Sequence, residues 1–427
     1  MEAWRKKHRL ALPVLLLVPL SIGLANVVNA IPSFSRKYQT SCSTCHYAYP
    51  QLSAFGKAFR NNGFRYPGGD ENFRKEEPVS LGSEAYKQVW PDAIWPSDIP
   101  GTSPLAVHAI GRFNLALHQP DSLATSTFEF PHEIELLYGG TLGKDFSFFG
   151  EVELETEGDE IEIAFPFRLD LNYRPAFNLS AGNQVVDPTP EHMRLTRTHY
   201  NVSSLKSRNG WRMRDEQSGL ELWGAGNGAG GRGGWKYAAG VVNGQGVVDA
   251  NRDKDFYARA TYKVAGLGEI GGTEGQASEA SAFYRDNSVT LGGLIYSGRV
   301  AGDLFADKED LAVWAGTADL WYERLIVNAS VLGMTSKIDG LSDRKSLAWY
   351  AQGQYVVFPW LIGLARLEST DSNTDDTTDA ATTLIPAVVG MVRANVKVTL
   401  EYKRPVSEYA ARKASEEGFT AQFNFSL

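Results

Sequence analysis

Five consecutive residues, Cys42 to His46, carry the most specific chemistry in this sequence. They read Cys-Ser-Thr-Cys-His and include the only two cysteines among 427 residues. Two thiols at this spacing can each form a thioether with one vinyl group of a haem, while the adjacent imidazole reaches one axial face of its iron. The motif therefore predicts one covalently bound haem c, attached through Cys42 and Cys45, with His46 as the proximal ligand.

The same cysteine spacing also occurs in zinc sites and in redox dithiols. Zinc needs a second pair of ligands with metal-binding spacing, and the sequence offers none. A thioredoxin-like dithiol opens a helix within a βαβ pattern, which the residues around Cys42 do not show. A dithiol remains the alternative to haem attachment.

The first 30 residues have the pattern of a cleaved secretory signal peptide. Basic residues up to Arg9 precede an apolar run, Leu10 to Leu24, and small residues end at Ala30. The apolar run is shorter than the roughly 20 residues of a membrane-spanning helix. We expect cleavage after Ala30 and export, which agrees with haem attachment because that step takes place outside the bacterial cytoplasm.

From residue 104 to residue 427 the sequence alternates apolar and polar residues with period two, in segments separated by turn-forming residues. In residues 161–173 the odd positions are apolar and most even ones are polar, so one face suits lipid and the other suits water. The last strand alternates in the same way up to Leu427. The pattern predicts an all-β fold, a transmembrane antiparallel barrel of about 16 strands (14–18).

A soluble β-sandwich is the alternative explanation of this alternation. Its apolar faces would need several cores in a chain of this length. The abundance of glycine and aromatic residues, 42 Gly with 18 Tyr, 21 Phe and 10 Trp, agrees better with a barrel in outer-membrane lipid. The net charge of −8 argues against nucleic-acid binding.

Residues 31–80 differ from the barrel and form the expected monohaem segment. After Pro50 the sequence predicts one short amphipathic helix that ends near Gly63. One helix is too small to enclose a porphyrin, so we expect the segment to plug the barrel, which would cover the haem. Residues 81–103 are the expected linker. The expected haem-packing residues are Phe34, Tyr49, Leu52, Phe55 and Phe59.

The sixth ligand of the iron cannot be a local methionine, because residues 31–102 contain no methionine and no histidine except His46. It could be water, nothing, an unusual donor or a barrel residue. His108 faces the lumen by parity and lies just after the linker, so it is the candidate ligand or near neighbour. By the same parity argument His132 should face lipid or an interface. His192, Met193 and His199 are expected in a loop or short strand.

Acidic residues alternate along two consecutive predicted strands. Because neighbouring strands lie roughly 5 Å apart, their carboxylates should form a wall on the lumenal side. The wall could concentrate small cations such as ferrous iron. It could equally serve only to keep the lumen polar and to neutralise the basic plug. Its members are Glu151, Glu153, Glu155 and Glu157, with Glu129, Glu133 and Glu135 on the preceding strand.

Residues 30–65 resemble the N-terminal segment of the fused outer-membrane cytochrome-porins of iron-oxidising bacteria. The resemblance implies a monohaem segment that caps a porin barrel, takes electrons from extracellular ferrous iron and passes them to a periplasmic carrier such as a soluble cytochrome c. Beyond residue 65 the resemblance is one of architecture only. Besides the Cys42–His46 motif, the residues that carry it are Ala30, Pro32, Phe34, Arg36, Tyr49, Pro50, Leu52, Phe55, Gly56, Phe59 and Gly63.

Three functions are consistent with these features. The first is an electron conduit that oxidises Fe(II), acting either as an Fe(II):cytochrome c oxidoreductase or as an electron-transfer protein. The second has the same architecture but delivers electrons outward to extracellular acceptors. The third is a diffusion porin whose haem segment is structural or sensory. A hydrolytic enzyme is disfavoured, because no G-x-S-x-G motif is present.

Overall fold

The computed structural model describes residues 33–82, 84–94, 97–117, 126–157, 160–190, 193–246, 251–272, 282–301, 308–376, 378–412 and 417–427. The expected signal peptide, His118 and His192 lie outside the described residues. Among the described residues, no helix is both long and apolar enough to cross a membrane.

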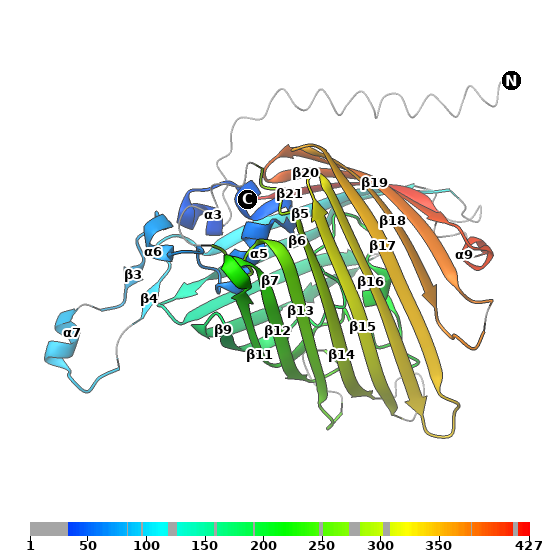
Figure 1. The fold of residues 1–427 in the computed structure, drawn as a ribbon, viewed down its shortest axis with the longest axis horizontal. Helices are drawn as coiled ribbons and strands as arrows, with labels where there is room; N and C mark the ends of the chain where they lie inside the picture. The colour runs from blue at the N-terminus through cyan, green and yellow to red at the C-terminus, as the bar shows by residue number, and fades with distance from the viewer. Residues whose placement is uncertain are drawn as a thin grey trace.

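Strands β5 to β21 form one closed antiparallel barrel, shown in Figure 1. Each strand pairs with its neighbour along the chain, and β21 pairs with β5 to close the ring. The first nine are β5 (Leu105–Ala116), β6 (Ser126–Leu142), β7 (Phe146–Glu157), β8 (Glu160–Ala164), β9 (Phe167–Arg174), β10 (Phe177–Gln184), β11 (Gln217–Asn227), β12 (Arg232–Val242) and β13 (Asp255–Leu267). The remaining eight are β14 (Ser288–Val300), β15 (Glu309–Tyr322), β16 (Leu325–Ile338), β17 (Arg344–Phe358), β18 (Leu361–Asp371), β19 (Ala381–Arg393), β20 (Val396–Pro405) and β21 (Gly418–Ser426).

Strands β8 and β9 occupy one position in the barrel. Both strands pair with β7. β9 pairs with its first half, residues 146–150, and β8 pairs with its second half, residues 153–157. Pro166 separates the two segments, because proline has no backbone N–H to donate to the hydrogen-bond ladder between strands. The seventeen segments, with these two counted as one, give sixteen strands in the described part of the chain. The predicted all-β barrel of about 16 strands is confirmed.

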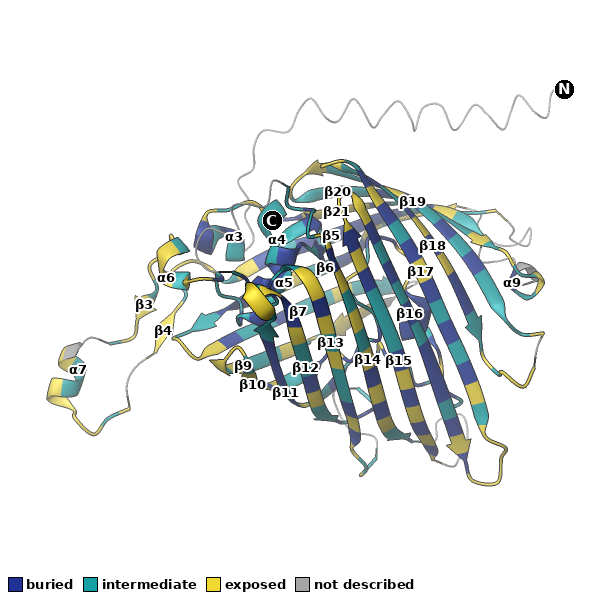
Figure 2. Ribbon diagram, viewed as in Figure 1, coloured by how far each residue is buried: buried dark blue, intermediate teal, exposed yellow. Residues whose placement is uncertain are grey.

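Buried and exposed residues alternate along the barrel strands, as Figure 2 shows. The exposed outer positions are rich in apolar side chains, and many polar side chains are buried inside. Ile295 and Trp314 expose more than half of their surface on the outside, whereas the lumenal side chains of Asn328 and Gln352 are almost fully buried. A water-soluble protein distributes these residue types in the opposite way. This distribution suits a cylinder that is surrounded by lipid.

One end of the barrel has mostly short turns. Two residues join β15 to β16, β17 to β18 and β19 to β20 at this end, and the longer connection 268–287 is the exception. The strands β5 and β21, next to the N-terminal segment and the C-terminus, also meet here. At the other end the connections are longer, for example residues 406–417 with α9 (Glu408–Arg412).

A small helical segment, residues 33–73, lies at the short-turn end, and we call it the plug. It contains α3 (Ser33–Tyr38), α4 (Cys42–Cys45), a hairpin of β1 (His46–Ala48) and β2 (Gln51–Leu52), α5 (Ala54–Asn61) and α6 (Asp70–Phe73). Its α5 is the helix expected after Pro50, and the Ser53 side chain caps it by accepting a hydrogen bond from the Gly56 N–H at 3.1 Å.

The plug is fixed to the barrel by polar contacts with several strands and turns. Lys57 pairs with Asp319 at 3.1 Å, and the Tyr47 hydroxyl donates to Gln354 at 2.9 Å. Arg65 donates to the Gly143 carbonyl at 3.1 Å, in the turn between β6 and β7. Because these partners lie far apart around the ring, the plug is held at several sides of the barrel at once.

The expected linker forms an arm that extends away from the barrel (Figure 1). It contains α7 (Glu84–Val89) and a two-stranded pair of β3 (Val79–Ser80) and β4 (Asp98–Ile99). The arm returns the chain to the start of β5 at Leu105.

Residues 185–216, between β10 and β11, fold back into the barrel, and we call them the inner segment. They include α8 (Asn201–Ser204), whose Asn201 side chain donates to the Ser369 carbonyl of β18 at 2.7 Å. Thr399 of β20 donates to the Leu195 carbonyl at 3.1 Å. The inner segment therefore crosses the lumen from β10 to the opposite wall.

Candidate functional site

A cavity of about 1520 Å³ lies inside the barrel, between the plug, the inner segment and the lumenal face of the strands. It is larger than the roughly 300–1,000 Å³ of ordinary small-molecule pockets. Cys42, Cys45 and His46 all border it. The motif with the most specific chemistry thus faces an enclosed space with room for a large ligand.

The two cysteines lie on the single turn of α4, and they form no disulfide. The Ser41 side chain caps this turn by accepting from the Ser43 N–H at 3.3 Å. Burial raises the pKa of Cys42 and raises that of Cys45 to about 12, so both are thiols at neutral pH. Gly56 of α5 packs so closely on α4 that a Cβ there would overlap the Cys45 carbonyl oxygen.

The His46 ring is oriented by a hydrogen bond between its Nδ1 and the Pro50 carbonyl oxygen at 2.9 Å. A carbonyl only accepts, so Nδ1 carries the proton and Nε2 keeps its lone pair. Burial lowers the pKa of His46 to about 4, although the hydrogen bond to Pro50 acts in the opposite direction. A neutral imidazole with Nδ1–H bound to a carbonyl is the usual state of a metal-ligating histidine.

Aromatic and aliphatic side chains surround the motif. Phe34 packs edge-on against Phe59 with ring centroids 5.3 Å apart and stacks on Phe64 at 5.2 Å. Phe55 packs against Tyr66 at 4.8 Å. All five expected haem-packing residues border the cavity: Phe34, Tyr49, Leu52, Phe55 and Phe59.

Phe64 and Tyr66 belong to the same cluster, and sequence reasoning missed them. They follow Gly63, which has a φ of 65° and ends α5, so they lie beyond the predicted helix. The turn at Gly63 brings them back toward α3. The only sequence signal for them was that they are aromatic and follow the predicted helix closely.

His108 of β5 faces the lumen, on the side its parity predicted, and is 5% exposed. The Tyr49 ring lies between it and the motif, with ring centroids 5.2 Å from His46 and 5.2 Å from His108. The Nδ1 of His108 lies 2.7 Å from the Glu135 carboxylate, and its Nε2 lies 3.3 Å from the Asn424 amide nitrogen. His108 is therefore a neighbour of the motif across one aromatic ring.

Two rows of carboxylates follow β6 and β7 along the cavity. In the antiparallel register Glu133 lies opposite Glu155, and Glu135 lies opposite Glu153. Glu129 and Glu151 border the same cavity. The side chain of Glu157 lies outside the described residues. The structure thus brings together the described members of the expected carboxylate wall.

The expected position of His132 is wrong, because His132 is buried on the lumenal side. Its Nδ1 lies 3.0 Å from Glu129 and its Nε2 lies 3.1 Å from Glu155. The register of β5 with β6 shifts between Ile110 and Arg112, where β6 contains extra residues. Residues inside a bulge of this kind leave the strict alternation, so parity counted from Phe128 fails at His132, although Glu129 and Glu133 on either side both border the cavity.

The inner segment also brings donors to the cavity. Met193 and His199 border it, as do the basic residues Arg194 and Arg197. The Met193 carbonyl accepts a hydrogen bond from Gln51 of the plug at 2.9 Å. The sequence placed Met193 and His199 in a loop or short strand but gave no reason to place them beside the haem motif.

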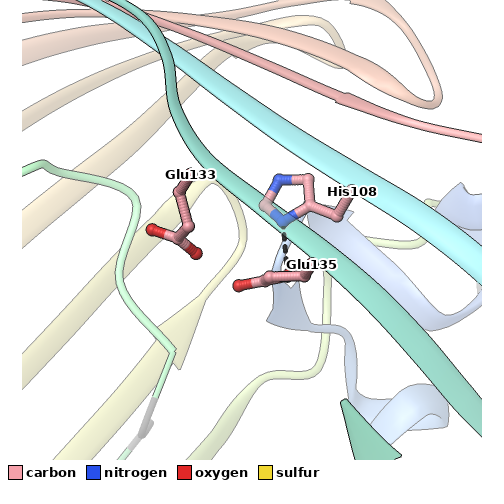
Figure 3. A group of neighbouring side chains, drawn as sticks. All are labelled: His108, Glu133 and Glu135. Atoms are coloured by element: carbon pink, nitrogen blue, oxygen red, sulfur yellow. Dashed lines mark hydrogen bonds and ion pairs between the residues drawn. The ribbon is translucent and has the colours of Figure 1, made fainter. Parts of the chain in front are cut away.

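Two sets of side chains have the spacing of metal ligands. His108, Glu133 and Glu135 form one, shown in Figure 3, and their ligand atoms lie within 4.8 Å of one another. His132, Glu133 and Glu155 form the other, so Glu133 belongs to both. The cavity therefore offers two kinds of site: one for covalent haem attachment on the plug and one for a cation on the wall.

No protein-family model matches this sequence, and no curated protein is significantly similar to it. Solved structures with a similar fold are outer-membrane barrels. A loop-deletion mutant of OmpT, an outer membrane protein of Vibrio cholerae, is 10% identical with a TM-score of 0.50, over 76% of this chain and 99% of that one. An anion-selective porin from Comamonas acidovorans is 10% identical with a TM-score of 0.48, over 76% of this chain and all of that one. The likeness to the OmpT mutant shows the porin-like barrel fold.

Proposed function

We propose that this chain is an outer-membrane cytochrome-porin that moves electrons across the membrane through one haem c bound inside the barrel. The observation that carries the proposal is the position of Cys42, Cys45 and His46, which together border a lumenal cavity instead of the protein surface. The motif supplies both thioether positions and one axial ligand. The barrel supplies the enclosure that the short plug lacks.

The residues around the motif fit a haem. Nε2 of His46 is the free donor, because Nδ1 is engaged with Pro50. The aromatic cluster around Phe34 and Phe59 offers an apolar surface for a porphyrin. When bound, haem iron accepts and releases one electron at a time. The chain then has to hold it, exclude bulk water and bring it within reach of partners on both sides.

The orientation of the barrel determines which partner reaches which side. Outer-membrane barrels have short periplasmic turns and longer external loops, so the short-turn end would face the periplasm. The plug lies at that end, where Arg65 contacts the turn between β6 and β7. A periplasmic electron carrier would thus approach the plug. An extracellular donor would approach from the opposite end, along the carboxylate wall.

Haem attachment is tested by haem staining of the full-length protein after denaturing electrophoresis. We expect the mature protein, made in a host that attaches haem c, to retain the stain, and we expect Cys42→Ser with Cys45→Ser to lose it. Ser43→Ala is the matched control, because it changes the motif and keeps both thiols and His46. A wild-type protein that never stains would refute the proposal.

The direction of electron flow is tested by rapid mixing of the oxidised protein with ferrous iron. The proposed Fe(II) oxidation predicts reduction of the haem, seen in its absorption spectrum. Failure of ferrous iron to reduce the haem at any accessible pH would favour the reverse direction, in which electrons leave the cell for an extracellular acceptor. Both directions use the same cavity, so the geometry alone does not choose between them.

A further inference from the structure

We infer that His108, Glu133 and Glu135 form a binding site for a divalent transition-metal cation in the barrel wall, one aromatic ring away from the haem motif. The site deepens the proposed function and its redox role rests on it, because it would be where a ferrous ion stays while it gives up its electron. Binding of the cation itself does not depend on haem. Each part can therefore be tested separately.

The backbone places the three ligands on adjacent strands. His108 of β5 is paired in register with Glu135 of β6. Glu133 precedes Glu135 by two residues and lies on the same face of β6. Figure 3 shows the three side chains beside one another, with the dashed line joining the His108 ring to Glu135. Their ligand atoms lie within 4.8 Å of one another. Metal–ligand bonds of about 2.1 Å can bridge this spacing after small side-chain rotations.

The charges around the site favour a cation. Glu133 and Glu135 lie directly opposite Glu155 and Glu153 of β7. Like charges directly opposite each other destabilise an antiparallel pair. A divalent cation between the rows removes this repulsion, so the wall gains stability when the ion binds. A lumen that only needed polar residues would not require carboxylates at four facing positions.

A second observation concerns the adjacent ligand set, which is the other place that a cation could occupy. His132 belongs to this other ligand set, which also contains Glu133, and the His132 side chain is only 7% exposed. Its buried Nδ1 makes no hydrogen bond of acceptable geometry, although the Glu129 carboxylate lies 3.0 Å away. Arg112 contacts the other nitrogen of this ring, and its positive charge disfavours an ion there. We therefore assign the cation to the His108 side of Glu133.

The ligand types select the class of cation. Imidazole suits iron, zinc, copper and nickel, whereas carboxylates alone suit calcium, magnesium and manganese. One imidazole with two carboxylates thus favours a borderline divalent transition metal, which includes Fe(II). Water molecules would complete the coordination, because the site is open to the cavity.

The position of the site connects it to the motif. Tyr49 contacts the rings of both His46 and His108 at 5.2 Å. In the proposed reaction one Fe(II) at the site loses one electron and becomes Fe(III), and the haem iron gains that electron and changes from ferric to ferrous. In this step a bound ferric haem would be the oxidant, so no proton or further reactant is needed. Beyond Glu133 and its partner Glu155 the wall continues along β6 to Glu129, nearer the outer end.

Binding is tested with Co²⁺, because it resembles Fe²⁺ in its ligand preference and stays divalent in air. Equilibrium dialysis of the full-length protein in detergent should give one saturable Co²⁺ per chain. Glu133→Gln should weaken binding on the order of 100-fold, and His108→Gln should weaken it in the same direction. Glu216→Gln is the matched control, since Glu216 also borders the cavity but belongs to neither ligand set. Circular dichroism shows which variants keep the barrel.

The outcomes separate the site from the proposed function. Equal Co²⁺ binding by Glu133→Gln and Glu216→Gln, or no saturable binding by the wild type, overturns the site. Co²⁺ binding that persists in Cys42→Ser with Cys45→Ser supports it without any haem. If haem attaches and ferrous iron reduces it at the same rate in Glu133→Gln and in wild type, the redox role of the site fails while the conduit stands.

Discussion

At the residue scale, Gly56 decides whether α4 and α5 can pack together. A side chain there would overlap the Cys45 carbonyl oxygen, which belongs to the backbone and cannot rotate away. We expect Gly56→Ala to push α5 off the motif at a cost of about 1–3 kcal/mol, the usual range for overpacking. Haem content per chain should fall below that of the wild type, measured by the absorbance of the bound haem.

Gly353→Ala is the control for that change. Gly353 lies on β17, and a Cβ there meets no atom within 4 Å. Its haem content should equal that of the wild type. Equal haem content in both alanine variants would mean that the contact between α4 and α5 does not position the motif.

For individual residues, the sequence predicted which side of the barrel the acidic side chains face, because the period-two alternation along each strand alone determines it. Glu133 and Glu135 border the cavity for that reason. The same rule failed at His132, since a register shift in β6 depends on how β5 pairs with it. The distance between His46 and His108 was equally beyond the sequence, because it depends on where the plug meets the barrel.

At the element scale, the part of the inner segment at residues 207–209 is anchored to the wall by one carboxylate. Glu309 of β15 accepts hydrogen bonds from the Ser207 hydroxyl and from the backbone N–H groups of Arg208 and Asn209, at 2.7–2.8 Å. Glu309→Ala leaves these buried donors unsatisfied, at about 1–3 kcal/mol each. We expect the inner segment to detach and to become cleavable by a protease near Arg208, measured by limited trypsin digestion.

Asp310→Ala is the matched control for this prediction. Asp310 is the next residue, is exposed and pairs with Arg299 at 2.5 Å on the outer side of the same strand. Its removal takes away the same charge and leaves the inner segment anchored, so trypsin sensitivity should not change. Equal cleavage in both variants would show that Glu309 does not hold the segment.

The place of the inner segment also marks the limit of sequence prediction for elements. From the sequence, Met193 and His199 of this segment were expected in a loop or short strand. Its folding into the lumen depends on partners one hundred or more residues away, such as Glu309 for Asn209. The local sequence pattern carries no information about such contacts, so it could not place the segment inside the barrel.

At the scale of the whole molecule, barrel closure followed from the sequence because every strand repeats the same period-two pattern. The number of strands was predicted closely, since each is bounded by turn residues that the sequence shows. The contents of the lumen were not predictable in the same way. Plug, inner segment and wall meet through single contacts, such as Gln51 with the Met193 carbonyl, that no repeating pattern encodes.

The way these parts fill the barrel leads to a prediction about ion flow. The plug lies at the short-turn end, where Lys57 and Tyr47 bind it to β15 and β17. We expect the full-length protein to conduct poorly in planar bilayers. Removal of residues 33–73 should produce larger, cation-selective conductance steps, because the carboxylate wall then lines an open path. The inner segment still crosses the lumen, so the steps should stay below those of an open porin.

Deletion of residues 79–99 is the control, because this part of the arm extends away from the barrel and leaves the plug in place. Its conductance should match that of the full-length protein. A full-length protein that already conducts as well as the variant without the plug would show that the plug does not seal the barrel. That result would favour the diffusion porin over the conduit, since a path open to ions and solutes is what a porin requires and an electron conduit does not.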